Sequence, residues 1–368
     1  MKRFYITLFS LMFAGSAMAG NLRDGFTTGS PEIKSIGSLA FGPEGILFIG
    51  DSQSGAVFAI DTGDKTPATQ NEKLEVNRID ERIASLLGTT VKDIRILDLA
   101  VNPISHNAYL SISRGQGKDE AHIILRVTSP DNIEEVSLQN ISYSKRELSN
   151  IVDVDAKDHR GRSLRSLSIT DLVYHKNQLF IAGLSNEEFS SILRVTPFPF
   201  EEKEETSSLE IFHAAHKRYE TNAPIRTFLT YEMRDVSQIL AAFTCTPLVS
   251  FPMSEIQETG HVKGATVAEL GSNNRPLDMI VYKKEDKDFI LLANSNRTLM
   301  KIDMEDINKQ EPVTEAVTER WGTAGVDFLA VPQVGVQQID NLNDDYVLAI
   351  QRAGNGDLNL RSLPIRRL

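Results

Sequence analysis

The chain has very little cysteine, since Cys245 is the only one in 368 residues. A single thiol cannot form an internal disulfide, so packing must hold the fold together. Basic residues are also in deficit: 39 Lys and Arg stand against 50 Asp and Glu, and the formal net charge is −11. Nucleic-acid phosphates are neutralised by clusters of Lys and Arg, which this sequence lacks. We therefore expect no nucleic-acid partner.

Long apolar runs are missing after the first 19 residues. No later stretch approaches the roughly 20 apolar residues that span a bilayer, so we expect no membrane insertion. Residues 1–19 differ, because Lys2 and Arg3 precede an apolar run that ends in Ala17-Met18-Ala19, the layout of a cleaved secretory signal. We predict a signal peptide at 1–19, a mature chain of net charge −13 that begins near Gly20, and a periplasmic or secreted location.

The sequence does contain an internal repeat. Residues 36–61, IGSLAFGPEGILFIGDSQSGAVFAID, have the pattern of three short strands separated by turns. Similar phrases begin near residues 97, 170, 225, 277 and 336, which makes six copies. Such repeats are typical of a propeller, in which each blade is one small sheet. We predict an all-β, six-bladed β-propeller that forms a single domain over residues 20–368, in a monomeric protein.

The fourth strand of each blade is less regular. Segments that follow the third strands suggest LEVNRI (74–79), EEVSLQNISY (134–143), SSLEIFHAA (207–215), KGATVAEL (263–270) and TEAVTERW (314–321). The sixth copy has no such segment, and residues 21–35 have no partner. We therefore predict that the N-terminal segment closes the ring. Between blades one and two, the helical spacing of Ile79, Ile83 and Leu86 predicts a short helical insertion within residues 78–94.

The first copy carries a family resemblance. AFGPEGILFIGDSQSGAVFAID, with its Pro-x-Gly turn and its Gly50-Asp51 strand end, resembles the repeat of the NHL and SMP-30/gluconolactonase-like propellers. The resemblance implies a six-bladed propeller. For the lactonases of that superfamily it also implies a divalent metal on the channel axis, held by an acidic residue of the first blade and by Asn and Asp of later blades. This chain departs from that pattern, because its first blade opens with Ile36-Gly37-Ser38-Leu39.

The innermost strands of a propeller line its channel, so equivalent repeat positions should form a ring. Aligning the copies places six residues at one level: Ser38, Asp98, Asp171, Arg226, Asp278 and Gln337. Asp98, Asp171 and Asp278 could bind a hard cation through their oxygens. Arg226 could bind an anionic ligand with two hydrogen bonds. The structural alternative is that each Asp caps a turn or bonds to the neighbouring blade.

A second candidate is the segment from His213 to Glu220. Two His residues three apart share one face of a helical turn, and a carboxylate four residues further on can join them in a transition-metal site. The alternative is a solvated loop whose His residues cap or pack. His159 is a third candidate, in a charged loop just before Asp171, where it would either form the rim of the channel mouth or be simply solvated.

Two functions of different classes follow. The preferred one is an exported, non-catalytic propeller that binds a small molecule or a partner protein at one channel mouth, through Arg226, His213, His216, Glu220 and His159. The alternative is a metal-dependent hydrolase of the lactonase or esterase kind, with a divalent cation such as Ca or Zn held by Asp98, Asp171 and Asp278. Binding is preferred because no acidic ligand stands at Ser38. We also predict that Arg226 lies within ion-pair reach of Asp171 or Asp278, with His213 or His216 near the same mouth.

Overall fold

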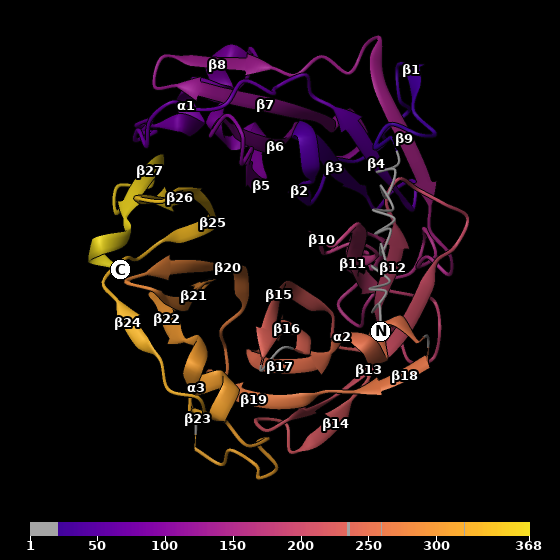
Figure 1. Cartoon of the computed structure of the whole chain (residues 1–368), viewed down its shortest axis with the longest axis vertical. Coiled ribbons are helices and arrows are strands. Elements are labelled where there is room, and N and C mark those ends of the chain that lie inside the picture. Colours follow the sequence, from indigo (N-terminus) through magenta and orange to yellow (C-terminus); the bar gives the residue numbers. More distant parts are fainter. Residues whose placement is uncertain (1–20, 234–235, 259, 320) are drawn as a thin grey trace, which may run out of the picture.

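The computed structural model describes residues 21–368 apart from 234–235, 259 and 320, so the predicted signal peptide lies outside the described residues. In the described part, small sheets stand in a ring around a central axis (Figure 1). The prediction of an all-β, six-bladed propeller is confirmed. None of the helices in this part is long and apolar enough to cross a membrane.

Each blade is built mainly from antiparallel strands, and its innermost strand comes first in the sequence. Blade one is the exception, because the N-terminal strand precedes its innermost strand and lies at its outer edge. Blade one contains β2 (Leu39–Phe41), β3 (Ile46–Asp51), β4 (Ala56–Asp61), β9 (Ile141–Glu147) and β1 (Thr27–Gly29), from the centre outwards. Blade two contains β5 (Ile94–Val101), β6 (Ala108–Arg114), β7 (Ala121–Ser129) and β8 (Asn132–Glu135). Blade three contains β10 (Asp171–His175), β11 (Gln178–Leu184), β12 (Ser191–Pro197), β13 (Glu205–His213) and β14 (Arg218–Glu220), with β18 (Gly260–Lys263) parallel to β13.

The other three blades follow the same plan. Blade four contains β15 (Ile225–Met233), β16 (Val236–Phe243), β17 (Pro247–Pro252), β19 (Ala265–Glu269) and β23 (Ala324–Gly325). Blade five contains β20 (Pro276–Lys284), β21 (Lys287–Asn294), β22 (Leu299–Asp303) and β24 (Leu329–Val331), and blade six contains β25 (Val336–Asn343), β26 (Tyr346–Arg352) and β27 (Leu358–Pro364). The helices are α1 (Ile79–Leu86), α2 (Met253–Gln257) and α3 (Met304–Lys309), with 3-10 turns at Pro43–Gly45, Val91–Asp93, Gly117–Asp119, Arg165–Leu167 and Ile365–Arg367.

The blades do not follow one another around the ring in sequence order. The innermost strand of blade one, β2, contacts both β5 of blade two and β10 of blade three, and β5 also contacts β25 of blade six. The order in space is therefore two, one, three, four, five, six, and back to two (Figure 1). The chain returns across blade one, because β9 follows blade two in the sequence but pairs with β4.

Three of the five segments predicted as fourth strands do not form the fourth strand of the blade they follow. Val76, from LEVNRI, exchanges backbone hydrogen bonds of 2.9 Å with Leu360, so this segment extends blade six beyond β27. It closes the ring, whereas the N-terminal strand β1 pairs with β9 on the outer edge of blade one. EEVSLQNISY is divided between β8 and β9, and the described residues of TEAVTERW form no strand. The alternation of apolar and polar residues predicts that a segment is a strand. It does not predict the partner, because every strand edge offers the same backbone hydrogen bonds, and side-chain packing determines which edge the segment joins. The other two segments are confirmed as β13 and β19.

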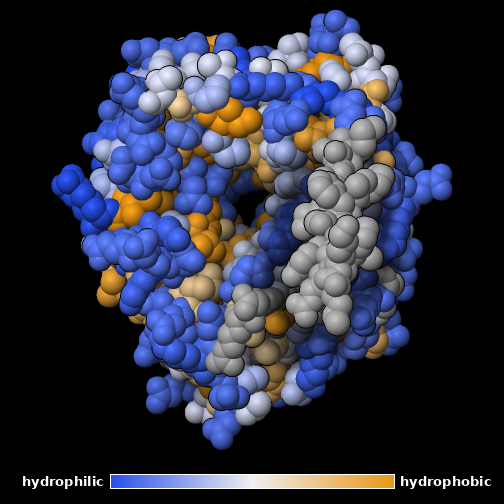
Figure 2. All heavy atoms as spheres, in the orientation of Figure 1, coloured by the Kyte–Doolittle hydropathy of each residue, from blue (hydrophilic) through white to orange (hydrophobic). Residues whose placement is uncertain are grey.

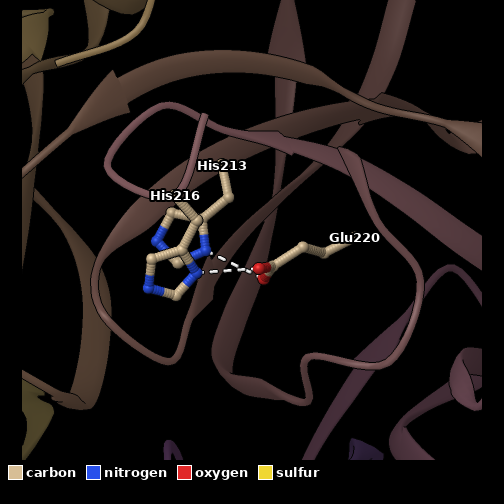
Figure 3. Close-up of side chains that lie close together, drawn as sticks. All are labelled: His213, His216 and Glu220. Carbon is tan, nitrogen blue, oxygen red and sulfur yellow. Dashed lines mark hydrogen bonds and ion pairs between the residues drawn. The ribbon is translucent and has the colours of Figure 1, made fainter. Parts of the chain in front are cut away.

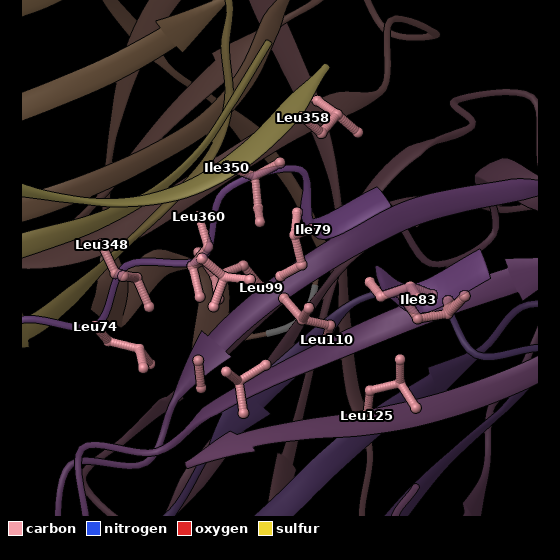
Figure 4. Close-up of a cluster of buried hydrophobic side chains, with 14 of the residues drawn as sticks. Leu74, Ile79, Ile83, Leu99, Leu110, Leu125, Leu348, Ile350, Leu358 and Leu360 are labelled. Carbon is pink, nitrogen blue, oxygen red and sulfur yellow. The ribbon is translucent and has the colours of Figure 1, made fainter. Parts of the chain in front are cut away.

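The hydrophobic core is divided among the junctions between neighbouring blades. One cluster fills the junction of blades two and six, with Ile79 and Ile83 of α1 against Leu110 of β6 and Leu360 of β27 (Figure 4). The predicted helical insertion is confirmed in the sequence between blades one and two, yet in space α1 packs against β27 and β5. Each large apolar side chain buried there contributes roughly 1.5–3 kcal/mol, so these junctions hold the blades in fixed positions.

Candidate functional site

Figure 2 shows an opening at the centre of the ring, and the innermost strands of several blades carry an Asp. At the three predicted Asp residues, one oxygen accepts a backbone N–H from the next blade, and the other accepts the N–H of the following residue in its own strand. The interblade bonds run from Leu39 N to Asp98 Oδ2 (2.6 Å), from Phe228 N to Asp171 Oδ2 (2.9 Å) and from Ile339 N to Asp278 Oδ2 (2.7 Å). These Asp residues therefore have the structural role that the sequence left open: they bond to the neighbouring blade. A cation at this ring stays a prediction.

Two further side chains also join neighbouring blades, but as hydrogen-bond donors. The Ser38 hydroxyl of blade one donates to the carbonyl of Thr170 in blade three at 2.9 Å, and the Gln338 amide of blade six donates to the carbonyl of Leu97 in blade two at 3.0 Å. Asp340 was not predicted, yet its Oδ2 accepts the backbone N–H of Val101 in blade two at 2.7 Å. We call Asp98, Asp171, Asp278 and Asp340 the axial carboxylates.

Arg226 does not stand at the ring level that the aligned repeats predicted. In blade four, Ile225 pairs with Phe243 and Thr227 pairs with Ala242, which leaves Arg226 as the extra residue of a β-bulge. The same irregularity occurs in blades two, five and six, where Leu97, Leu277 and Gln337 are the extra residues directly before Asp98, Asp278 and Gln338. A bulge re-aims a side chain. The residues equivalent to Asp98 and Asp278 are therefore Thr227 and Gln338. Aligning the copies by sequence alone placed Arg226 and Gln337 at the ring one residue too early.

The axial carboxylates have raised pKa values. Burial, followed by repulsion from the other axial carboxylates, raises the pKa of Asp98 and of Asp278 well above the ordinary value. Burial also raises the pKa of Asp171 and of Asp340 to about 6. The backbone N–H donors oppose this increase but do not outweigh it. The ring therefore carries less negative charge near neutral pH than its four Asp residues suggest.

A cavity of 750 Å³ lies at one mouth of the channel. Arg226 lines it, together with Lys34, Arg95, Glu120, His122 and residues at or just before the innermost strands of blades one to three, among them Ser38, Leu97 and Thr170. The Nε of Arg226 is enclosed and has no hydrogen-bond partner. Burial and the neighbouring Arg275 lower the pKa of Arg226, and Asp171 opposes them only in part. No ion pair within 4.0 Å joins Arg226 to Asp171 or Asp278 among the described residues, so that prediction is wrong. Arg226 is the extra residue of its strand, and Thr227 holds the position that corresponds to Asp278.

The acidic group of this cavity is already neutralised. Glu120 accepts hydrogen bonds of 2.5 Å from both Arg95 and Ser113. Burial would raise the pKa of Glu120, but these two partners outweigh it and lower the pKa. Lys34 is exposed and, within the described chain, no ion pair involves it. The cavity therefore has an excess of positive charge, carried by Lys34 and Arg226.

His213, His216 and Glu220 come together at the outer edge of blade three. His213 ends β13 and Glu220 ends β14, so a β-hairpin joins them where the sequence predicted a helical turn. The Nδ1 atoms of His213 and His216 lie 2.9 Å and 2.7 Å from the two oxygens of Glu220 (Figure 3). The centres of the two imidazoles are 3.7 Å apart. A hairpin pairs residues across a turn, so this spacing needs no helix.

These residues do not share the channel-mouth cavity with Arg226. Strands β10 to β13 alternate in direction, so the end of β13 lies on the face of the propeller at which β10 begins. The hairpin is therefore on the same face as Arg226, but at the outer end of the blade, and none of its three site residues lines the cavity. His159 is exposed on a turn, where Arg160 Nε donates to it at 3.2 Å, and it does not line the cavity either. The residues predicted to form one site thus lie in three separate places: the cavity with Arg226, the hairpin with His213, His216 and Glu220, and the turn with His159.

Glu269, at the end of β19 in blade four, completes the group on the outer edge. Its Oε2 lies 3.8 Å from the Nε2 of His213 and accepts the backbone N–H of Ala215 at 3.3 Å. Sequence reasoning missed it, although a lone acid in the apolar run Val267-Ala268-Glu269-Leu270 was a usable signal. We call His213, His216, Glu220 and Glu269 the rim cluster.

The two carboxylates of the rim cluster differ in pKa. Burial would raise the pKa of Glu220, but hydrogen bonds from His213, His216 and Arg218 outweigh it and lower the pKa to about 2. Burial raises the pKa of Glu269, which has fewer donors. Among the described residues, His213, His216 and Glu220 form the one group of at least three His, Cys, Asp or Glu whose ligand atoms all lie within 4.8 Å of one another. The axial carboxylates form no such group.

The fold and these sites define the chain as a six-bladed β-propeller with a polar channel. No protein-family model matches it, and no curated protein gives a significant match. Solved structures with some likeness include the mitotic checkpoint complex, at 9% identity and a TM-score of 0.38 over 99% of both chains. The extracellular region of plexin A4 has 8% identity and a TM-score of 0.38, over 93% of this chain and 40% of that one. A putative glucose dehydrogenase from Thermus thermophilus has 10% identity and a TM-score of 0.35, over 92% and 99%.

The fold assignment rests on the sheets of this chain itself, because likenesses this weak carry no argument about function. The six-bladed architecture that the NHL and SMP-30-like resemblance implied is present. Membership of either family is not shown.

Proposed function

We propose that this protein is an exported, non-catalytic propeller that binds a small anion, such as a carboxylate or a phosphate ester, at the channel mouth. The observation that carries the proposal is Arg226, whose enclosed Nε has no partner while its side chain lines the 750 Å³ cavity. Small-molecule sites typically have volumes of roughly 300–1,000 Å³ and a few convergent polar groups.

The charge balance of the cavity supports an anion over a cation. Asp171 offsets the charge of the largely enclosed Arg226 only in part. A buried cation with an incomplete counter-charge is costly, and a bound anion would offset that cost. A guanidinium presents its N–H groups in a planar fork that matches carboxylate and phosphate oxygens. Glu120 does not compete for Arg226, since Arg95 and Ser113 already bind it.

The arrangement of the axial carboxylates supports binding over hydrolysis. A lactonase-like metal would need the oxygens of Asp98, Asp171 and Asp278 as ligands. Each of these side chains instead accepts one backbone N–H from the neighbouring blade and one from the next residue of its own strand. Their ligand atoms also do not approach one another as closely as those of the rim cluster. The hydrolase alternative therefore gains no support from the geometry.

Calorimetric titration tests the proposal with a panel of mono- and dicarboxylates, phosphate and sugar phosphates. We expect at least one to bind at one equivalent and to bind Arg226→Gln about 10-fold or more weakly, because charge-assisted hydrogen bonds contribute about 1.5–3 kcal/mol. Arg361→Gln is the matched control, since Arg361 is exposed on β27. Equal binding by both variants would contradict the proposal, and capture of an acidic protein through Arg226, with no small anion bound, would favour the partner-protein alternative.

Export is supported by the pattern of residues 1–19 alone. Sequencing the N-terminus of the protein recovered from outside the cytoplasm should give a start at or near Gly20. A product that keeps Met1 and stays in the cytoplasm would contradict this part of the proposal.

A further inference from the structure

We propose that the rim cluster is a site for one transition-metal ion of the Zn²⁺ class, bound by His213, His216 and Glu220, with Glu269 as a positioning residue for His213. The site is independent of the channel-mouth ligand, because it lies at the outer edge of blade three and none of its residues lines the cavity.

The spacing of the three ligating groups is close to what such an ion requires. Zinc binds imidazole nitrogens at about 2.0–2.1 Å and carboxylate oxygens at about 2.0–2.2 Å in a tetrahedron, which places neighbouring ligand atoms about 3.3 Å apart. The Nδ1 atoms of His213 and His216 now lie 2.9 Å and 2.7 Å from the oxygens of Glu220. Ordinary side-chain torsions provide the remaining separation of about 0.5 Å.

Two buried atoms next to the proposed ligands lack hydrogen-bond partners. His213 is 1% exposed and Glu269 is 0% exposed. The Nε2 of His213 and the Oε1 of Glu269 make no hydrogen bond. In metal sites, a His ligand usually donates its other ring N–H to a carboxylate, which fixes the tautomer and the ring orientation. Glu269 is placed to act in this way, since its Oε2 is 3.8 Å from Nε2 of His213.

The two imidazoles are oriented alike. Figure 3 shows that each turns one nitrogen toward the Glu220 carboxylate and its other nitrogen away from it. The side chain of His216 is 42% exposed, so one side of the group is open to water, which can enter and occupy a fourth ligand position. Two nitrogens and one oxygen are the donors that zinc accepts, whereas Ca²⁺ takes six to eight oxygens. The donor set therefore selects the zinc class.

Blade four fixes the hairpin that carries the ligands. Thr266 Oγ1 donates to the carbonyl of Phe212 at 2.7 Å, and Glu269 holds the N–H of Ala215. The N–H of Val317 donates to the carbonyl of Ala214 at 3.1 Å. These bonds order the turn before any ion binds, and such preorganisation reduces the cost of binding.

The experiment is titration of the full mature chain, without a chelating tag, with Zn²⁺ by calorimetry and with Co²⁺ by visible absorption. We expect one equivalent of each metal and the intense absorption of tetrahedral Co²⁺. Replacing a partner outside the ligand set usually costs about 10- to 100-fold in affinity, which is the loss expected for Glu269→Gln. His216→Gln removes a direct ligand, so its loss should exceed about 100-fold.

Two controls separate this proposal from its competitors. His159→Gln removes an exposed His elsewhere on the chain and should leave both titrations unchanged. Arg226→Gln should also bind the metal normally, so failure of the anion proposal leaves this one testable. Wild-type protein that binds no stoichiometric Zn²⁺, or His216→Gln that binds it with full affinity and a native circular dichroism spectrum, overturns the metal site. Full affinity in Glu269→Gln overturns its positioning role.

Discussion

The axial carboxylates and Glu220 of the rim cluster are enclosed acids whose pKa values move in opposite directions. Asp171 accepts backbone N–H groups, and its pKa is raised to about 6 because burial dominates. Glu220 accepts hydrogen bonds from two His residues and from Arg218, and its pKa is lowered to about 2. Backbone N–H groups give a carboxylate hydrogen bonds but no compensating positive charge. Imidazoles and a guanidinium can supply that charge as well. Ionised Glu220 is thus suited to bind a cation, whereas the axial carboxylates are suited to hold neighbouring blades together.

The largest expected effect is loss of a blade contact. Asp98→Ala leaves the N–H groups of Leu39 and Leu99 without their acceptor. Each unpaired buried donor costs about 1–3 kcal/mol, so the free energy of unfolding should fall by about 2–6 kcal/mol in urea titrations. Asp155→Ala removes an exposed Asp and should stay within about 0.5 kcal/mol of wild type. Similar stabilities for both variants would show that the axial carboxylates do not lock the blades.

The pH dependence of Asp171 should be that of an acid stabilised in its protonated form. Its folded-state pKa of about 6 exceeds the ordinary 3.8, so its stabilising contribution is complete below pH 3.8 and is lost as the pH rises through 6. Asp171→Asn removes this titration. Relative to that variant, wild type should lose up to about 3 kcal/mol of unfolding free energy between pH 4 and 7. A constant difference across this range would contradict the raised pKa.

Glu220 should show the opposite sign. Its folded-state pKa of about 2 lies below the ordinary 4.5, so its contribution is present above pH 4.5 and is lost as the pH falls toward 2. Between pH 5 and 3, wild type should lose about 1–2 kcal/mol more than Glu220→Gln in denaturant titrations of metal-free protein, since solvent screens part of the interaction. A parallel loss in both proteins would mean that His213 and His216 do not stabilise the ionised carboxylate.

The smallest effect should be seen at Cys245, which reports on charge near the rim cluster. Burial raises the pKa of this thiol, and the charges of Glu269 and Glu220 raise it further. Glu269→Gln removes one of those charges, so at pH 8 the thiol should react about 2- to 3-fold faster with a disulfide reagent. Glu255→Gln, on the exposed side of α2, is the control and should react as wild type. An unchanged rate in Glu269→Gln would mean that its charge does not reach the thiol.

Local pattern was enough to predict the architecture and part of each site. The six strand-turn-strand copies gave the blade number, and the spacing of Ile79, Ile83 and Leu86 gave the helical insertion. The pattern also selected Arg226 and the trio of His213, His216 and Glu220 as residues with chemistry to offer. These features depend on alternation, helical periodicity and side-chain type, which are properties of short segments.

Tertiary structure decided which blades are neighbours and which strands and side chains contact one another. It placed blade two between blades one and six, joined Val76 to blade six, and brought Glu269 to within 3.8 Å of His213 across two blades. The strand register put Thr227 at the predicted ring position and left Arg226 to line the cavity. Strand edges offer the same hydrogen bonds to every partner, and a pKa depends on neighbours far away in the chain. The sequence therefore determined the kind of elements and the candidate groups, and only packing between blades determined their partners and their charge.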